Sequence, residues 1–397
     1  MRFFSRKYIF SYLYKLLCKK QIAASYSLSW EQRKFEEIAV RSSVICSDAN
    51  LPRVEYEDIV SGAGRLNKDI YAKQSSKSGI AFHRGDVLYG KLRPYLQNWL
   101  LPTFDGLAVG DFWVLQPQNA DSSFLYQLIQ SRQFDEVANQ STGTKMPRAD
   151  WKLVSKTVFS IPSNISEQAA IGTYFTALDN LITLHQRKYD KLTNVKKSML
   201  EKMFPKNGSN VPEIRFKGFT EAWEQRKLGE VFNFHYGDGN NNPSNGGQYP
   251  VFGAGGIQGR YTKYNAENSI IIGHMGDAGC VSWGEGKHFV TYNGTITTPK
   301  DDVFTAKFGY YLLLNMNLRK YRGGSGLPFL TYDMLTEMET KCPNSKIETQ
   351  EIADYFTQLD HLITLHQCEF QIVSKRRKAR LRRRAFEFTV IFALIVL

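Results

Sequence analysis

The sequence predicts an α+β protein in which two bodies of mixed strands and short helices are each followed by a long helix, and the two long helices pair as a coiled coil. Three observations lead to this fold class. Short segments recur once along the chain, the stretches between them are dissimilar and turn-rich, and the second recurring segment has heptad spacing. A chain of 397 residues is also long enough for more than one core.

The recurring segments set the order of the chain. WEQRK at Trp30–Lys34 recurs at Trp223–Lys227, 193 residues later. YFTALDNLITLHQ at Tyr174–Gln186 recurs as YFTQLDHLITLHQ at Tyr355–Gln367, 181 residues later, with eleven of thirteen positions identical. Near-identical ends around dissimilar bodies indicate one scaffold that carries two different binding bodies.

The stretches between the repeats are predicted to form the two α+β bodies. Runs such as VLYGKLRPYLQNWLLP and SIIIGHMGDAGCVSW are broken by Gly and Pro, which favours strands and turns over a βαβ series. Short helices are expected at Phe124–Val137 and Phe308–Leu318. A weaker repeat, TGTKMP at Thr142–Pro147 and GGSGLP at Gly323–Pro328, is interpreted as a backbone turn near the end of each body.

The second repeat is predicted to lie on a long helix in each half. No Gly or Pro interrupts the first copy between Thr173 and Phe204, and at 1.5 Å per residue the helix would be roughly 50–60 Å long. Its apolar stripe needs a partner, for which the other copy is the natural candidate; packing of each helix on its own body is the alternative. The residues expected to pair the helices are Ile171, Leu178, Leu181, His185, Leu192, Ile352, Leu359, Leu362 and His366.

The ends of the repeats and a linker rich in Pro, Gly and Asn predict where the chain divides. The predicted parts are an atypical N-terminal segment at 1–29, a first body at 30–165, a first long helix at 166–204, a linker at 205–219, a second body at 220–346, a second long helix at 347–374, and a basic then apolar tail at 375–397.

Motifs for catalysis, nucleotide binding or metal binding are not evident. The Gly-rich stretch Phe252–Gly259 is followed by RYTKY, which favours another strand rather than the helix that a phosphate- or S-adenosylmethionine-binding loop would open. His361 and His366 do not have H-E-x-x-H spacing, and Ser325 lies outside a G-x-S-x-G motif. We therefore expect no catalytic residue, no metal site and no cofactor bound by this chain.

Charge favours an anionic partner such as nucleic acid. The formal net charge is +13, although eight Lys or Arg at Lys375–Arg384 account for much of the excess. Five widely spaced cysteines without a C-x-x-C pair favour a reducing cytoplasm over a disulfide framework or a zinc site. The basic N-terminal stretch is interrupted by Lys15, and the apolar stretch Phe386–Leu397 is short for a spanning helix, so no membrane attachment is expected.

Basic side chains in the loops of both bodies are the candidate DNA contacts, because Lys and Arg can reach phosphates and base edges. The candidates are Lys91, Arg93, Lys145, Arg148 and Lys152 in the first body and Arg260, Lys263, Lys287, Lys320 and Arg322 in the second. The aromatic residues interleaved with them are Tyr89, Tyr95, Trp99, Trp151, Tyr261 and Tyr264. A solvated surface position is the alternative for any single basic residue.

Together, the WEQRK segments, GDVLYGKLRP, GTKMPR and the paired LDxLITLHQ helices resemble the specificity subunits of type I restriction–modification enzymes, over about Trp30 to Gln367. The resemblance implies two target-recognition domains on a pair of antiparallel helices. Each domain would read a few base pairs of double-stranded DNA, mainly through the major groove, and the helices would set an unread spacer between the two half-sites.

The resemblance also implies the partners. Two methyltransferase (modification) subunits would dock on the conserved regions, carry S-adenosylmethionine and methylate adenine N6. Restriction subunits would add translocation and cleavage that use ATP and Mg, while this chain would be a non-catalytic subunit. The alternatives are a stand-alone restriction nuclease or methyltransferase fragment, against which the missing motifs count, and a coiled-coil scaffold, against which the two dissimilar bodies count.

Two stretches depart from the family pattern. The first 29 residues lack the P-E-[IL]-R-F-x-G-F lead that is present ahead of the second body at Pro212–Phe219. In the second long helix the seam positions after Val373 become Arg376, Arg380 and Arg383. The sequence therefore predicts weakened helix pairing at that end.

Overall fold

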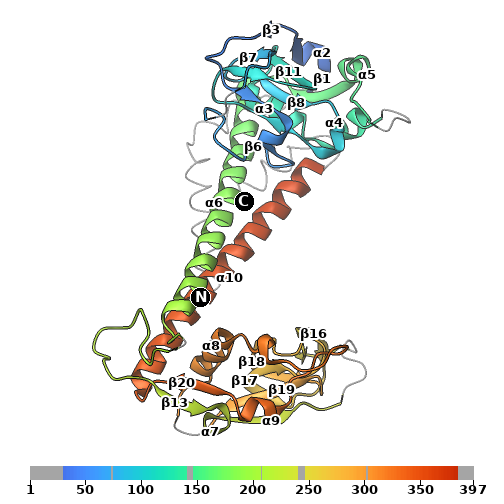
Figure 1. Ribbon diagram of the computed structural model, residues 1–397. Helices are drawn as coiled ribbons and strands as arrows, with labels where there is room; N and C mark the ends of the chain where they lie inside the picture. The colour runs from blue at the N-terminus through green and yellow to red at the C-terminus, as the bar shows by residue number, and fades with distance from the viewer. Residues whose placement is uncertain are drawn as a thin grey trace. The chain divides into compact units, whose positions relative to one another are not determined.

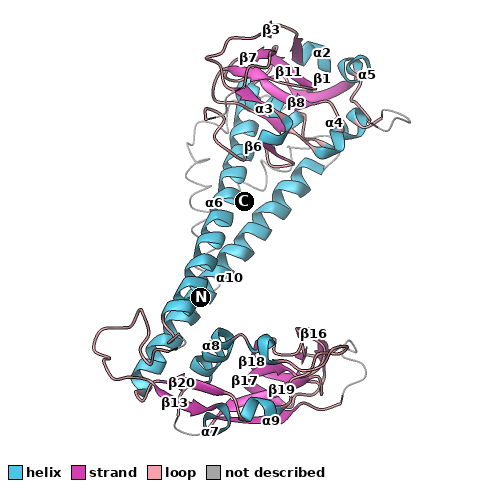
Figure 2. Ribbon diagram, in the orientation of Figure 1, coloured by secondary structure: helices cyan, strands magenta, loops and turns pink. Residues whose placement is uncertain are grey.

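The computed structural model describes residues 30–72, 75–140, 146–206, 208–239, 246–300 and 303–382. The chain forms two compact units (Figures 1 and 2). Unit 1 contains the chain up to Leu184 and again from Glu369, and unit 2 contains His185–Cys368. Each unit therefore holds one of the two predicted bodies together with parts of both long helices.

Each body is closed by a two-stranded antiparallel ladder between its first and last strands. Glu31 pairs with Ile161 in unit 1, and Glu224 pairs with Cys342 in unit 2. These pairs are related by the two repeat offsets, so the ladders have the same register. The strands are β1 (Trp30–Lys34) and β12 (Val158–Pro162) in unit 1, and β13 (Glu224–Lys227) and β20 (Glu339–Cys342) in unit 2.

The body of unit 1 contains two four-stranded sheets, in the orders β2-β11-β8-β9 and β3-β7-β10-β4, and the separate pair β5-β6. Apolar side chains from the first sheet pack with the short helices in one core, where the rings of Tyr89 and Trp113 stack 5.6 Å apart. The strands are β2 (Ala39–Ser42), β3 (Ile45–Cys46), β4 (Arg53–Val54), β5 (Ile59–Val60), β6 (Arg65–Leu66), β7 (Gly79–Phe82), β8 (Val87–Gly90), β9 (Trp99–Leu100), β10 (Gly106–Ala108) and β11 (Phe112–Pro117).

The single helix expected at Phe124–Val137 is wrong, because this stretch forms two short helices. The Oγ of Ser131 accepts a hydrogen bond from the Phe134 amide (3.2 Å) and caps a new helix there. The helical segments of this body are α2 (Phe35–Ile38), η1 (Tyr56–Asp58), η2 (Pro94–Leu96), α3 (Ser122–Leu128), α4 (Arg132–Ala138) and α5 (Trp151–Lys156).

The body of unit 2 is built on one six-stranded sheet, β14-β19-β17-β18-β15-β16. The strand expected over the residues that follow the Gly-rich stretch lies earlier than predicted. The Gly-rich stretch itself forms the turn of the β15–β16 hairpin, in which Gly253 pairs with Gly256, and β16 ends at Tyr261. The strands are β14 (Phe232–Tyr236), β15 (Tyr249–Gly253), β16 (Gly256–Tyr261), β17 (Ala266–Gly273), β18 (Val281–Val290) and β19 (Gly294–Pro299). The helical segments are α7 (Leu228–Val231), α8 (Ala306–Met316), η3 (Leu318–Tyr321) and α9 (Tyr332–Thr336).

The two long helices are α6 (Ile165–Lys202) and α10 (Lys346–Arg382), and each begins soon after the closing strand of a body. Helix α10 is longer than the predicted 347–374, because the Lys- and Arg-rich stretch that follows contains strong helix formers and no Gly or Pro. Among the helices of the described ranges, none is both long and apolar enough to cross a membrane.

The predicted pairing residues divide between body packing and helix packing. Ile171 and Leu178 lie in the core of unit 1, and Ile352 and Leu359 lie in the core of unit 2, so the first turns of each helix pack on their own body. Leu181 and Leu192 are half-buried against the unit 1 and unit 2 cores, respectively. The prediction for Leu362 is wrong: its side chain is 41% exposed.

Polar contacts join the two helices within each unit. In unit 2, the Nδ1 atoms of His185 and His366 lie 3.1 Å apart, and Lys196 Nζ lies 2.6 Å from Asp360 Oδ1. Residue numbers rise along α6 as they fall along α10, so these segments are antiparallel. In unit 1, the guanidinium of Arg377 pairs with the carboxylate of Asp179 and donates to Gln130 Oε1 at 2.7 Å. Helix contact therefore continues beyond Val373, through an Arg rather than an apolar residue.

Candidate nucleic-acid interface

In unit 1 the loop that leaves β8 is held by the segment that leads into α5. The Arg93 amide donates to the Pro147 carbonyl at 2.7 Å, and the Ala149 amide donates to the Lys91 carbonyl at 2.8 Å. We call residues 91–95 with 146–149 the first junction. It joins the GKLRP motif to the end of the TGTKMP element, two motifs that are far apart in the sequence.

In unit 2 the loop that leaves β17 is held in the same way. The Gly276 amide donates to the Pro328 carbonyl at 3.1 Å, and the Leu330 amide donates to the His274 carbonyl at 2.9 Å. We call residues 274–277 with 323–330 the second junction. Pro147 and Pro328 are the matching prolines of the weaker repeat, so both bodies make the same connection although their sequences differ.

Two basic residues of the first junction share one carboxylate. Arg148 Nη2 lies 3.0 Å from Asp111 Oδ2, and Lys91 Nζ lies 3.5 Å from Asp111 Oδ1. Arg93 is exposed, and no described residue forms a hydrogen bond with its guanidinium. The charge of Arg93 therefore has no counter-charge among the described residues, whereas the charges of Lys91 and Arg148 are partly compensated by Asp111.

A half-buried tyrosine, Tyr56, joins this junction to Asp111 through hydrogen bonds. The hydroxyl of Tyr56 donates to the Asp111 carbonyl at 2.6 Å and accepts from the Leu92 amide at 3.0 Å. Burial raises the pKa of Tyr56, so the hydroxyl keeps its proton and both bonds. The loop that carries Lys91 and Arg93 is thus fixed to the strand that begins after Asp111.

The second junction contains an ion pair that sequence reasoning missed. Arg319 donates through Nε and Nη2 to both carboxylate oxygens of Asp277, at 3.0 and 2.7 Å, and holds the pKa of Asp277 below its usual range. The predicted candidate Arg322 is exposed nearby in sequence. The sequence showed the basic run at 319–322, but it did not show which of these residues would form an ion pair.

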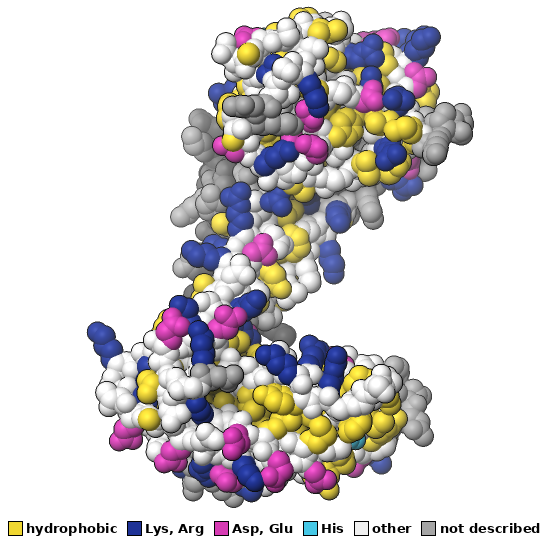
Figure 3. Space-filling model, viewed as in Figure 1, with side chains coloured by type: hydrophobic (Ala, Val, Ile, Leu, Met, Phe, Trp, Pro, Cys, Tyr) yellow, Lys and Arg dark blue, Asp and Glu magenta, His cyan; other side chains and the backbone are white. Residues whose placement is uncertain are grey.

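Basic side chains also occur elsewhere on the surface. Figure 3 shows Lys and Arg side chains interspersed with hydrophobic ones on the viewed face of both units.

An aromatic group beside the second junction was also missed. The Tyr236 ring lies 4.2 Å from the His274 ring and 5.1 Å from the Tyr332 ring, measured between centroids. His274 Nδ1 donates to the Leu330 carbonyl at 2.9 Å, which fixes the imidazole. Tyr236 and Tyr332 are 36% and 40% exposed, so part of each side chain is accessible to solvent. Their sequence positions are far apart, and only the fold brings them together.

Several predicted aromatic contacts are core residues instead. Tyr89 and Trp99 are buried in unit 1. Trp151 packs against the same core, with the Arg41 guanidinium 5.2 Å from its ring centroid. Of the interleaved aromatic residues in the first body, Tyr95 is the one in open solvent, at 57% exposure.

The remaining basic candidates of the second body are spread over other contacts. Arg260 donates to the carbonyls of Gly247 (2.9 Å) and Gln248 (2.6 Å), so it supports the backbone next to β15. Lys287 Nζ lies 4.5 Å from the centroid of the Tyr264 ring, whose hydroxyl raises the pKa of this lysine. Lys263 is exposed in the same region of sequence. In the first body, Lys152 is exposed on α5, and Lys145 lies outside the described residues.

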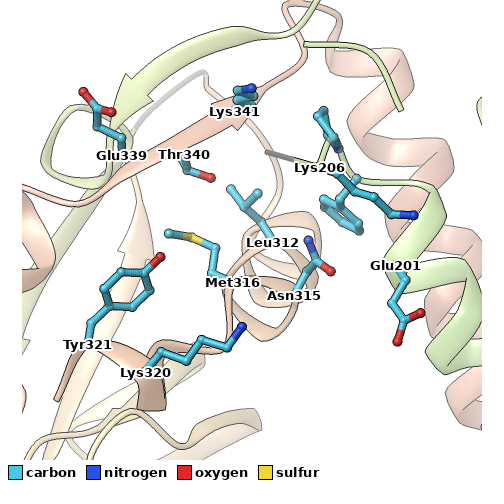
Figure 4. A pocket seen from close by; sticks show the side chains of 12 residues that line it. Glu201, Lys206, Leu312, Asn315, Met316, Lys320, Tyr321, Glu339, Thr340 and Lys341 are labelled. Carbon is cyan, nitrogen blue, oxygen red and sulfur yellow. The ribbon is translucent and has the colours of Figure 1, made fainter. Parts of the chain in front are cut away.

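A polar pocket of about 600 Å³ lies beside Lys320 in unit 2 (Figure 4). Two of its lysines already have partners: Lys206 pairs with Glu213 at 3.3 Å, and Lys341 donates to the Ser209 carbonyl at 2.5 Å. The pocket is lined by Glu201, Phe204, Pro205, Lys206, Leu312, Asn315, Met316, Lys320, Tyr321, Glu339, Thr340 and Lys341. The predicted candidate Lys320 therefore lines this pocket.

Comparison with known families identifies the class of protein. The type I restriction modification DNA specificity domain matches residues 63–194 and 220–372, which is most of the chain and covers both bodies. The chain therefore belongs to the family of type I restriction–modification specificity subunits. The duplicated bodies and the two long helices are those expected from that family.

Two relatives show how far the similarity extends. The specificity subunit of the type I restriction enzyme EcoDI from Escherichia coli is 24% identical over 186 residues, which is 44% of this chain and 41% of that protein. The chain thus spans about two fifths of the length of this curated relative. The crystal structure of a type I restriction–modification S subunit from M. genitalium shares the fold, with a TM-score of 0.66, 16% identity, and coverage of 91% of this chain and 97% of that one.

Proposed function

We propose that this chain reads a bipartite target in double-stranded DNA, with one short block recognised by each body, as the specificity subunit of a type I restriction–modification complex. The observation that carries the proposal is the repeated junction. In two bodies of different sequence, the loop after a central strand is hydrogen-bonded to a proline turn, and basic side chains lie beside that connection. Membership of the family supports assigning this shared feature to DNA.

The side chains at the junctions have different expected roles. Arg93 and Arg322 are exposed and would contact phosphates or base edges directly. Lys91 and Arg148 share Asp111, and Arg319 is held by Asp277, so these three would position the loops or exchange partners when DNA binds. Tyr95, Tyr236 and Tyr332 offer apolar faces for contacts with bases or sugars.

The chemistry would come from partner subunits. We propose that two modification subunits bring S-adenosylmethionine and methylate adenine, that restriction subunits bring ATP- and Mg-dependent translocation and cleavage, and that this chain binds none of these cofactors. The two methylated adenines would lie in the two blocks, separated by an unread spacer.

The test is a complex of this chain with its modification subunits, assayed for DNA affinity across salt concentrations and for adenine methylation across a genome. Neutralising Arg93 by Arg93→Gln is expected to lower the slope of log affinity against log salt by about one if it contacts a phosphate, or to cost about 1–3 kcal/mol and relax one base position if it contacts a base. Arg322→Gln is expected to act on the other block.

The matched control is Arg33→Gln, which removes an exposed guanidinium from β1 of the same body. It should leave affinity and methylated sites unchanged. Mapping that returned a single continuous target, or junction variants that altered neither affinity nor base preference, would contradict the proposal.

A further inference from the structure

In unit 2 a buried glutamate at the start of α10 binds an arginine from the linker. Glu348 is 1% exposed and accepts from Arg215 through both carboxylate oxygens: Nε to Oε1 at 2.6 Å and Nη2 to Oε2 at 2.8 Å. The indole of Trp223 donates to the same Oε1 at 3.3 Å. The linker residue Phe216 packs edge-on against Tyr355, with ring centroids 6.1 Å apart. The linker is thus anchored by an arginine and the aromatic residue that follows it.

Unit 1 contains the same carboxylate in the same place. Glu167 precedes Glu348 by 181 residues, and Trp30 precedes Trp223 by 193, which are the offsets of the two repeats. Both glutamates lie in the first turn of a long helix, next to closing ladders of identical register. The indole of Trp30 hydrogen-bonds to Glu167, as Trp223 does to Glu348. The two sites therefore match in carboxylate, indole and backbone.

The unit 1 site differs because no cation among the described residues pairs with the carboxylate of Glu167. Glu167 is 7% exposed, and its Oε2 atom has no hydrogen-bond partner among the described residues. Oε2 is the position that receives Nη2 of the arginine at Glu348. Burial raises the pKa of Glu167, the direction expected of a carboxylate that has lost water without gaining a cation. A buried charge without compensation is costly, and a paired arginine is the group that relieves this cost in the other copy.

We propose that the Glu167–Trp30 site of unit 1 binds the arginine side chain of an extended peptide segment with the chemistry of Pro212–Phe219, an arginine followed by an aromatic residue. The planar guanidinium fits because it can donate to a carboxylate in a fixed fork, which an ammonium group cannot. The arginine has two possible sources. The first 29 residues of this chain contain Arg2, which is followed by Phe3, and Arg6; otherwise a separate polypeptide supplies it.

The experiment titrates a fluorescent peptide of sequence VPEIRFKGF, copied from residues 211–219, against the full chain and measures anisotropy. Two changes should each weaken binding roughly tenfold or more: replacement of the peptide arginine by citrulline, which keeps the shape without the charge, and Glu167→Gln in the protein. The matched control is Glu351→Gln, which removes an exposed carboxylate near the start of the other long helix. It should leave the affinity unchanged.

An Arg2→Gln/Arg6→Gln variant distinguishes the two sources. Equal binding by this variant and the unaltered chain means that the arginine comes from another polypeptide. Binding by the variant alone means that the chain's own N-terminal arginine fills the site. Both results require that the citrulline peptide binds at least about tenfold more weakly than the arginine peptide. The proposal is overturned if neither protein binds the peptide, or if the citrulline peptide binds as tightly as the arginine peptide. The citrulline comparison uses whichever of these two proteins binds the arginine peptide, and both keep Glu167, so the comparison holds even where Glu167→Gln impairs folding.

Discussion

The ammonium group of Lys196 lies 2.6 Å from the carboxylate of Asp360, joining α6 to α10 in unit 2. In unit 1, Arg377 makes the equivalent bond to Asp179. Asp179 and Asp360 are 181 residues apart, and so are Lys196 and Arg377. The aspartate of each LD element is therefore the acceptor of one helix-to-helix ion pair in each unit, and the Arg-rich end of α10 keeps a cation where the repeat requires one.

Removing this cation should destabilise unit 2. Lys196→Gln is expected to cost about 1–3 kcal/mol of unfolding free energy. It removes the cation from the half-buried carboxylate of Asp360, which keeps the hydrogen bond from the Tyr311 hydroxyl at 2.9 Å. Lys197→Gln is the matched control, since Lys197 is the exposed neighbour on the same helix. Urea denaturation of the two variants measures the difference, and equal losses would show that the ion pair contributes nothing.

Breaking the buried ion pair between Arg215 of the linker and Glu348 of α10 should lower the unfolding free energy more than Lys196→Gln does. Among the described residues, Arg215→Gln leaves the buried carboxylate of Glu348 with the indole of Trp223 as its one remaining hydrogen-bond donor, and about 3–5 kcal/mol of unit 2 stability should be lost. Hydrogen exchange of the β13 and β20 amides reports on this unit separately, which matters in a chain with two compact units. The double variant with Glu348→Gln should regain part of the loss; a double variant as unstable as the sum of the two single ones would contradict the assignment.

Acid should destabilise unit 2 through His288. Its Nδ1 donates to the Gly286 carbonyl at 2.8 Å, Nε2 lies 2.9 Å from the Ser269 hydroxyl, and burial lowers its pKa from 6.5. The unfolded chain then binds a proton more readily than the folded one, so stability should fall as the pH drops below about 6.5. His288→Gln should flatten this pH dependence, whatever its effect on absolute stability. Replacing the exposed His235 should not; equal slopes for the two variants would refute the role of His288.

A glycine in α6 sets how closely that helix approaches α3. A Cβ atom on Gly172 would lie 2.6 Å from the Ser123 Cβ and 2.7 Å from the Ser123 carbonyl carbon. Gly172→Ala should therefore destabilise unit 1 by about 1–3 kcal/mol, although alanine is the better helix former. Thr173→Ala, at the exposed neighbouring position, is the control. A thermal unfolding midpoint for Gly172→Ala at or above that of the unaltered chain would rule out the close contact.

The architecture could be predicted because short segments that recur in the sequence mark the bounds of the bodies and the positions of the long helices. Two offsets and one heptad pattern located the two bodies and the long helices, whereas the ladders that close the bodies, which share one register, were found only in the structure. The boundary at 374 was wrong because heptad reading assumes an apolar seam, whereas Arg377 continues the contact through charge. The prediction that Leu362 pairs the helices was wrong for the converse reason, since an apolar residue at a heptad position need not be buried.

The candidate site was harder to predict than the fold. Sequence reasoning placed Arg93, Arg148 and Arg322 in loops of the two bodies. It could not show that Arg148 pairs with Asp111 or that Arg260 supports the backbone next to β15. Such partners are distant in sequence, and a side chain's availability depends on them. The Tyr236–His274–Tyr332 group was missed because its members come from three separate segments that only the fold assembles.

The ladder between the first and last strands of each body also determines how freely the residues between these strands can change. Because β1 lies beside β12, and β13 beside β20, each body starts and ends about 4.8 Å apart, the distance between neighbouring strands. Its length can therefore vary without altering the helix that follows, and the spans between repeats indeed differ by twelve residues in this chain. The near-identical stretches on either side belong to the framework that the two halves share. A body of different sequence could therefore take the place of the present one between the same two strands, while the closing ladder and the long helix stay as they are.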